Sequence, residues 1–137
     1  MKSFFRISLL MFVFAIFCMP IFSQSTNAFS QIDEAINLKN SEQINSFLDK
    51  NKNSRSYAEY ESYILKKARE LLISNELDFA AAISLAVIDH NIDNFDAVAL
   101  YTSIDTAIKA RDAKIKAEEE RRQIEEMREM ATIAKEQ

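Results

Sequence analysis

The pattern of apolar and polar residues between residues 31 and 56 predicts two short helices, or one broken helix, followed by a loop. Apolar side chains recur every three or four residues, which places them on one face of a helix. These positions are Ile32, Ala35, Ile36, Ile44, Phe47 and Leu48. Ser30 and Ser41 are candidate helix starts, because a serine side chain can accept a bond from a free backbone N–H. The polar run 49–56 that follows is rich in turn-forming residues and predicts a loop.

Two further helices are predicted between residues 56 and 90. Ser56 and Glu59 have the spacing at which two side chains bond each other's free N–H groups at a helix start. The first helix carries an apolar stripe made of Tyr60, Ile64, Ala68, Leu71 and Leu72. The segment SNELD, residues 74–78, interrupts this stripe. A second stripe of small and apolar residues follows, at Ala80, Ala81, Ile83, Ser84, Val87 and Ile88. We therefore expect an antiparallel helix pair with a short link.

A long helix is predicted from Phe95 to the end of the chain, where no glycine or proline interrupts the pattern. Asp93 or Asn94 is its expected cap. Its first part has enough apolar residues to close a small domain, namely Val98, Leu100, Tyr101, Ile104 and Ile108. Beyond Arg111 the sequence becomes highly charged, with Glu and Arg residues spaced for pairing within one helix. The pattern thus predicts a helix of about 40 residues that projects from the domain.

The charged part of this helix carries a weak apolar seam. Eight positions keep the alternating three- and four-residue spacing of a coiled coil. They are Ala110, Ala113, Ala117, Glu120, Ile124, Met127, Ala131 and Ala134. Because most are alanine and one is charged, we expect an exposed single helix, with a weak homodimer as the alternative. Ile124, Met127 and Met130 are the candidate contacts near the C-terminal end.

The first 23 residues have the organisation of a secretory signal peptide. Lys2 and Arg6 precede an almost unbroken apolar run over residues 7–19, and Pro20 ends the run. Cleavage is expected after Ser23, with export to the periplasm or the extracellular space. The alternative is an uncleaved segment that anchors the protein in a membrane. Residues 24–30 are expected to form a flexible leader.

Composition supports an all-α fold. The chain contains no glycine and one proline, although hairpin turns between strands usually require residues that adopt a positive φ easily. Its single cysteine, Cys18, lies in the signal peptide, so the mature protein is expected to fold without disulfides. The predicted organisation is a helical domain over residues 31–110 and a charged helical extension over residues 111–137.

Charge argues against nucleic acid as a partner. The chain has 17 basic and 21 acidic residues, and removal of residues 1–23 takes away two basic residues and no acidic one. The mature protein therefore carries 15 basic and 21 acidic residues, a net charge of −6. Because phosphates bind to basic surfaces, this balance disfavours DNA and RNA.

No catalytic or metal-binding motif emerges from the sequence. His90 is the only histidine, so one chain cannot build an imidazole pair or a histidine metal triad. Asp89, Asn91 and Asp93 match the start of a calcium loop, but Leu100 stands where such a loop needs a bidentate glutamate. The sequence therefore predicts a protein that is not an enzyme, with no cofactor and no metal.

Residues 61–94 resemble one tetratricopeptide repeat, a helix-turn-helix unit of 34 residues. The matching positions are Leu71, Asn75, Leu77, Ala80, Ser84 and Val87, with Ala68 at a further small-residue position. Ile64 and Ile92 depart from the family pattern, which usually has tryptophan and proline there. The resemblance implies a scaffold that binds peptides or protein helices. A tight helical core without repeat character is the other interpretation of the same residues.

Four tyrosines are candidate partner-binding residues. Tyr57, Tyr60 and Tyr63 are spaced three apart on one side of their predicted helix, and Tyr101 lies on the long helix. Tyrosines at this spacing are typical of a helical core, but tyrosine is also enriched in protein interfaces. The sequence thus predicts an exported helical adaptor that binds another protein. The alternative is a structural envelope protein that associates with itself through the C-terminal helix.

Overall fold

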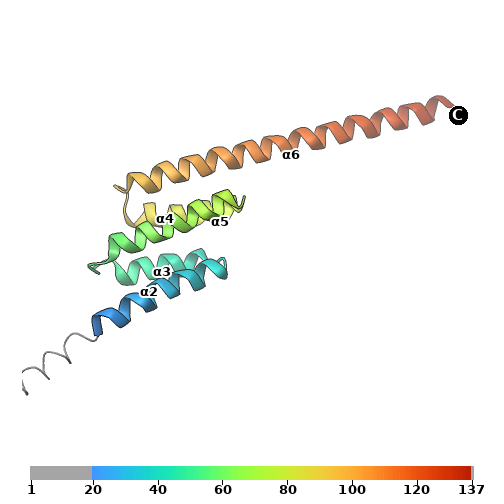
Figure 1. Cartoon of the computed structure of the whole chain (residues 1–137). Helices are drawn as coiled ribbons and strands as arrows, with labels where there is room; N and C mark the ends of the chain where they lie inside the picture. Colours follow the sequence, from blue (N-terminus) through green and yellow to red (C-terminus); the bar gives the residue numbers. More distant parts are fainter. Residues whose placement is uncertain (1–19, 137) are drawn as a thin grey trace, which may run out of the picture. The chain divides into compact units, whose positions relative to one another are not determined.

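The computed structural model describes residues 20–136, and within this range the fold is all-α, as predicted. Five helices follow one another without an intervening strand in the described residues. They are α2 (Pro20–Asn37), α3 (Ser41–Asn51), α4 (Tyr57–Ile73), α5 (Leu77–His90) and α6 (Phe95–Glu136), as labelled in Figure 1. The chain divides into two compact units, residues 1–64 and 65–137, and the division falls within α4.

The first unit contains α2, α3 and the first half of α4. Its buried apolar residues recur at the spacing of three and four that the sequence pattern predicts. They are Ala28, Ile32, Ala35, Ile44, Phe47, Leu48, Tyr60 and Ile64. The predicted break between two short helices is confirmed, because α2 ends at Asn37 and α3 begins at Ser41. Asn40, and not Ser41, caps α3 by accepting a bond from the Gln43 backbone N–H over 3.1 Å.

The N-terminal part of α2 differs from the sequence prediction. Residues 24–30, expected as a flexible leader, belong to α2, and Ser30 lies inside this helix instead of starting it. Ala28 is 7% exposed, and the Phe29 ring packs edge-on against Tyr60 and Tyr63. These contacts join residues about 30 positions apart, so the local polarity of the segment gave no sign of them. Most of the predicted signal peptide, residues 1–19, lies outside the described residues.

The second unit contains the second half of α4, all of α5 and α6. The SNELD interruption is confirmed, since α4 ends at Ile73 and α5 begins at Leu77. The predicted cap of α6 is Asn94, whose side-chain oxygen accepts a bond from the Ala97 backbone N–H over 3.1 Å. The core consists of Leu65, Ala68, Leu77, Ala80, Ile83, Ala86, Val87, Ala97, Leu100 and Ile104. Ser84 is buried among them and donates its hydroxyl to the Ala80 carbonyl.

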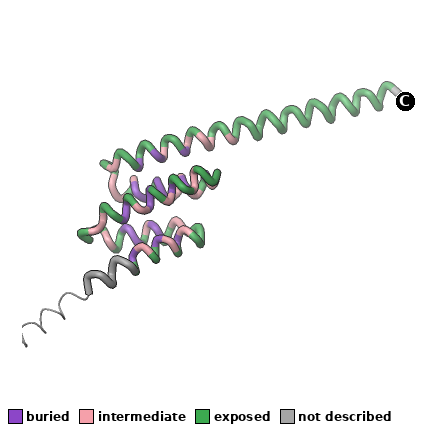
Figure 2. Tube along the Cα trace, viewed as in Figure 1, coloured by how far each residue is buried: buried purple, intermediate pink, exposed green. Residues whose placement is uncertain are grey.

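Helix α6 is the 42-residue helix that the sequence predicts. Its first four turns pack against the antiparallel α5, but every residue described from Asp112 to Lys135 is exposed. Figure 2 shows this change along α6 from buried and intermediate residues to a continuous exposed segment. We call residues 112–136 the α6 extension. Among residues 20–136, no helix combines the length and apolar character that crossing a membrane requires.

Candidate interaction surface

The tyrosines of α4 belong largely to the core of the first unit. Tyr60 is only 5% exposed, and its ring packs edge-on against Phe29 and Phe47, with centroid distances of 5.5 and 5.2 Å. Such edge-to-face pairs stabilise a core beyond the area that they bury. Tyr60 therefore holds α2, α3 and α4 together and offers little surface to a partner.

Tyr63 and Tyr57 have different roles on the same helix. The Tyr63 hydroxyl donates to the carboxylate of Asp33 on α2, with oxygen distances of 2.8 and 3.0 Å. The Tyr57 hydroxyl is buried and has no hydrogen-bond partner among the described residues. Burial raises the pKa of Tyr57, and the nearby carboxylates of Glu61 and Asp49 raise it further. Both side chains are half-buried.

Tyr101 belongs to a different unit from the other three tyrosines. It is half-buried on α6, within the second unit, whereas Tyr57, Tyr60 and Tyr63 belong to the first unit. Neither unit by itself contains a groove built from all four described side chains. The core interpretation of the tyrosine spacing thus accounts for the contacts of the α4 tyrosines.

A shallow hollow between α2 and α3 is too small for a typical ligand. It encloses about 210 Å³ and is lined mainly by polar residues, namely Gln31, Glu34, Gln43, Ser46, Phe47 and Lys50. Sites for small molecules usually enclose about 300 to 1,000 Å³ and are mainly apolar. The described residues also contain no group of three or more metal-ligating side chains close enough to hold an ion.

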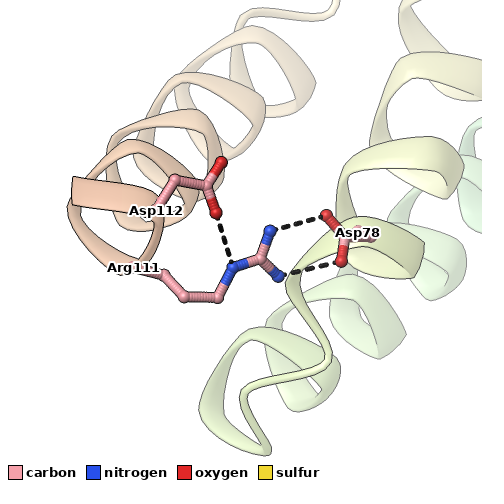
Figure 3. Close-up of polar contacts among 3 residues, drawn as sticks. All are labelled: Asp78, Arg111 and Asp112. Carbon is pink, nitrogen blue, oxygen red and sulfur yellow. Dashed lines mark hydrogen bonds and ion pairs between the residues drawn. The ribbon is translucent and has the colours of Figure 1, made fainter. Parts of the chain in front are cut away.

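An arginine clamp marks the point at which α6 passes the start of α5. The guanidinium of Arg111 donates two bonds to the carboxylate of Asp78, over 2.8 and 3.2 Å. Its Nε donates a third bond to Asp112 over 3.0 Å, and Figure 3 shows the three residues together. Asp78 lies in the first turn of α5, where a negative charge is favoured by the helix dipole. Two parallel hydrogen bonds fix the orientation of the guanidinium relative to the carboxylate as well as the distance between them.

The charges of this clamp reinforce one another. The hydrogen bond from Arg111 lowers the pKa of Asp78, and its positive charge acts in the same direction. The bonds to Asp78 and Asp112 raise the pKa of Arg111 above its already high usual value. Both partners are therefore ionised at neutral pH. This contact could not be predicted from the sequence, because it joins residues 33 positions apart. Its one local sign is an arginine at the end of the apolar stripe of α6.

The α6 extension exposes its apolar residues to solvent. Ile124, Met127 and Met130, the predicted contacts, are 47%, 58% and 64% exposed. Single exposed apolar side chains are normal on a protein surface, whereas a contiguous exposed group of them can mark an interaction site. These three residues lie in the 25-residue segment in which no described side chain is buried.

The seam of the extension lies on the side of α6 that faces away from α5. Successive residues of a helix are about 100° apart, so the 20 residues from Ile104 to Ile124 correspond to a rotation of about 200°. Ile104 is fully buried at the packed face, whereas the seam residues Ala117, Ile124 and Met127 are exposed. The fold thus leaves the seam open along its whole length.

Comparison of the chain with protein-family models, with characterised proteins and with solved structures found no match.

Proposed function

We propose that this protein is an exported, non-catalytic helical adaptor, and that the α6 extension is the part that contacts another protein. The observation that carries the proposal is the exposure of Ile124, Met127 and Met130 along a helix that no other described element covers. A helix with an apolar stripe is a common way to enter a groove or a second helix on a partner.

The anchoring of α6 supports this role. The first part of the helix is packed through Ala97, Leu100 and Ile104, and Arg111 clamps it to α5 at the end of the packed region. The remaining 25 residues reach about 38 Å at a rise of 1.5 Å per residue. A helix that is held at one end presents its stripe in a defined direction, which lowers the entropy lost on binding.

The rest of the proposal rests on the sequence. Export is inferred from the signal-like residues 1–23. The α4–α5 segment has the helix-turn-helix outline that a tetratricopeptide-like unit needs, with a three-residue link at residues 74–76. In the proposed adaptor, this pair forms part of the stable base from which α6 extends.

Site-specific photo-crosslinking in the native cell tests the function. A photoreactive amino acid is placed at Met127 on the seam, and in a matched variant at Glu129 on the other side of the helix. We expect a discrete crosslinked species of another protein from Met127 in the exported fraction, and much less from Glu129. A protein that stays in the cytoplasm, or gives no seam-dependent crosslink, contradicts the proposal.

The same experiment separates the adaptor from its alternative. A structural protein that associates with itself would use the same three- and four-residue spacing of the seam. In that case, Met127 would crosslink mainly to a second copy, giving a species of twice the mass of one chain. A dimer that light scattering detects for the full chain, and that is lost on removal of the chain after Ala113, would support this alternative, because the truncation leaves the packed part of α6 in place.

A further inference from the structure

The seam of the α6 extension has charged flanks with a clear pattern. With the seam positions Ala110, Ala117, Ile124 and Ala131 as the first residues of four heptads, the fifth position of every heptad is basic. These four residues are Lys114, Arg121, Arg128 and Lys135. All four are exposed. Residues seven apart drift by only about 20° on a straight helix, so the four form a basic row along one edge of the seam.

The opposite edge of the seam carries no acidic residue. Its positions in the first three heptads are Lys116, Gln123 and Met130, and all three are exposed. Within the seam itself, Glu120 is the one charged residue. Other acidic residues of the extension, such as Glu119 and Glu126, lie on the side away from the seam.

A second copy of the chain is a poor match for this surface in either orientation. In a parallel pair, a residue at one edge of the seam meets a residue at the other edge of the second copy, which brings Lys116 of one copy to Arg121 of the other. Glu120 of one copy then faces Glu120 of the second copy within the seam. In an antiparallel pair, the basic row faces the basic row. Like charges at these positions disfavour pairing and are a usual means of excluding a partner.

We propose that the occupant of the seam is an acidic amphipathic helix of another protein. Its edge residues are Glu or Asp, which meet the basic row, and it carries a Lys or Arg opposite Glu120. The small residues Ala110, Ala113 and Ala117 allow this helix to approach closely at one end. Ile124 and Met127 supply the larger apolar contacts toward the other end, where they are 47% and 58% exposed. This inference rests on the proposed adaptor function and specifies the chemistry of its partner.

Two designed helical peptides test the charge rule against the purified full chain. Both are about four heptads long with the same apolar core and a lysine opposite Glu120, but one has Glu at its edges and the other Lys. Fluorescence anisotropy of labelled peptide reports the affinity. We expect the acidic peptide to bind at least about tenfold more tightly at low salt, with the difference shrinking as salt screens the ion pairs.

Two neighbouring arginines give a matched control. Arg121→Glu reverses a charge in the basic row, whereas Arg122→Glu makes the same change about 100° further around the helix. We expect Arg121→Glu to weaken binding of the acidic peptide by about threefold to tenfold and Arg122→Glu to change it less than about twofold. Both side chains are exposed in the extension, so neither variant should alter the fold.

Three outcomes overturn the proposal. Equal binding of the acidic and basic peptides contradicts the charge rule, and so does equal weakening by the two arginine variants. A wild-type dimer detected by light scattering and lost on removal of the chain after Ala113 would identify a second copy as the occupant. Binding to vesicles of anionic phosphatidylglycerol in preference to the acidic peptide would assign the basic row to a lipid surface.

Failure of the charge rule is distinct from failure of the adaptor function. If Met127 crosslinks to another protein in the cell but the acidic peptide shows no preference, the adaptor function stands and the partner's charge is wrongly assigned. If Met127 gives no crosslink at all, the adaptor function is contradicted, whichever peptide binds more tightly.

Discussion

Lys39 and Asn75 close two helix ends in a conformation that glycine adopts most easily. Their φ angles are 50° and 61°. In each case the backbone N–H of the residue donates to the carbonyl three residues earlier. The N–H of the next residue donates to the carbonyl five residues before it, as in a Schellman motif. The chain has no glycine, so other residues must take this place. Asparagine tolerates the left-handed conformation because its short polar side chain can form a local hydrogen bond, but the long side chain of lysine gives no such help.

Lys39→Gly should therefore stabilise the protein. We expect the free energy of unfolding to rise by about 0.5 to 1 kcal/mol, because glycine removes the steric cost of the left-handed conformation. Urea denaturation followed by circular dichroism measures the change. Lys39→Ala is the control, since it removes the same side chain but keeps the β-carbon. A gain in stability from Lys39→Ala equal to that from Lys39→Gly would contradict the conformational explanation.

Two tyrosines of α4 should respond in opposite ways to loss of the hydroxyl. Tyr63→Phe removes the bond to the Asp33 carboxylate and should lower the free energy of unfolding by about 1 to 2 kcal/mol. Tyr57→Phe removes a buried hydroxyl without a partner among the described residues, so stability should stay the same or rise by up to about 1 kcal/mol. Thermal and urea unfolding of both variants checks this. Equal destabilisation would show that the Asp33 bond has no net effect.

At the scale of elements, the Arg111 clamp gives the α5–α6 pair a pH dependence. Because Arg111 lowers the pKa of Asp78, the folded state favours the carboxylate more than the unfolded chain does. The resulting stability is fully present above the usual pKa of 3.8 and is lost as the pH falls through the lowered value.

The pKa of Asp78 can be measured directly by NMR titration of its carboxyl carbon. We expect a value below 3.8 in the wild type and a return toward 3.8 in Arg111→Gln. Lys109→Gln is the comparison, because Lys109 pairs with Asp105 on the same helix and does not hold Asp78. A pKa of Asp78 that is unaffected by Arg111→Gln would contradict the clamp.

Element boundaries were predictable where the signal is local. The break at SNELD, the start of α6 after Asn94 and its length of 42 residues all follow from short-range pattern and the absence of glycine and proline. The helical state of residues 24–30 was missed because it comes with the contacts of Phe29 to Tyr60 and Tyr63. Contacts between residues so distant in sequence leave no periodic trace in a polar segment.

The candidate surface was predictable only where it depends on the local sequence pattern. Exposure of Ile124, Met127 and Met130 follows from their place in a highly charged helix. The core position of Tyr60 could not be decided, because three-residue spacing of aromatic side chains fits either a packed face or a binding face. Only the ring contacts with Phe29 and Phe47 separate the two.

At the scale of the whole molecule, α6 divides into a packed part and an exposed part. The part of α6 before Arg111 packs through its apolar face, and the extension leaves the other face open. Changes in the extension should therefore alter assembly without altering the fold. We expect changes of the seam and its edges to alter the oligomeric state, and a measurement of that state therefore tests this separation.

A double substitution should convert the chain into a dimer. Glu120→Leu removes the charge from the seam, and Lys116→Glu places an acid where a parallel second copy presents Arg121. We expect light scattering to give one chain's mass for the wild type and twice that mass for the double variant as concentration rises. Glu119→Leu with Arg122→Glu makes equal charge changes away from the seam and should remain a monomer. A dimer from this control variant, or a double variant that stays monomeric at high concentration, would mean that seam charges do not set the oligomeric state.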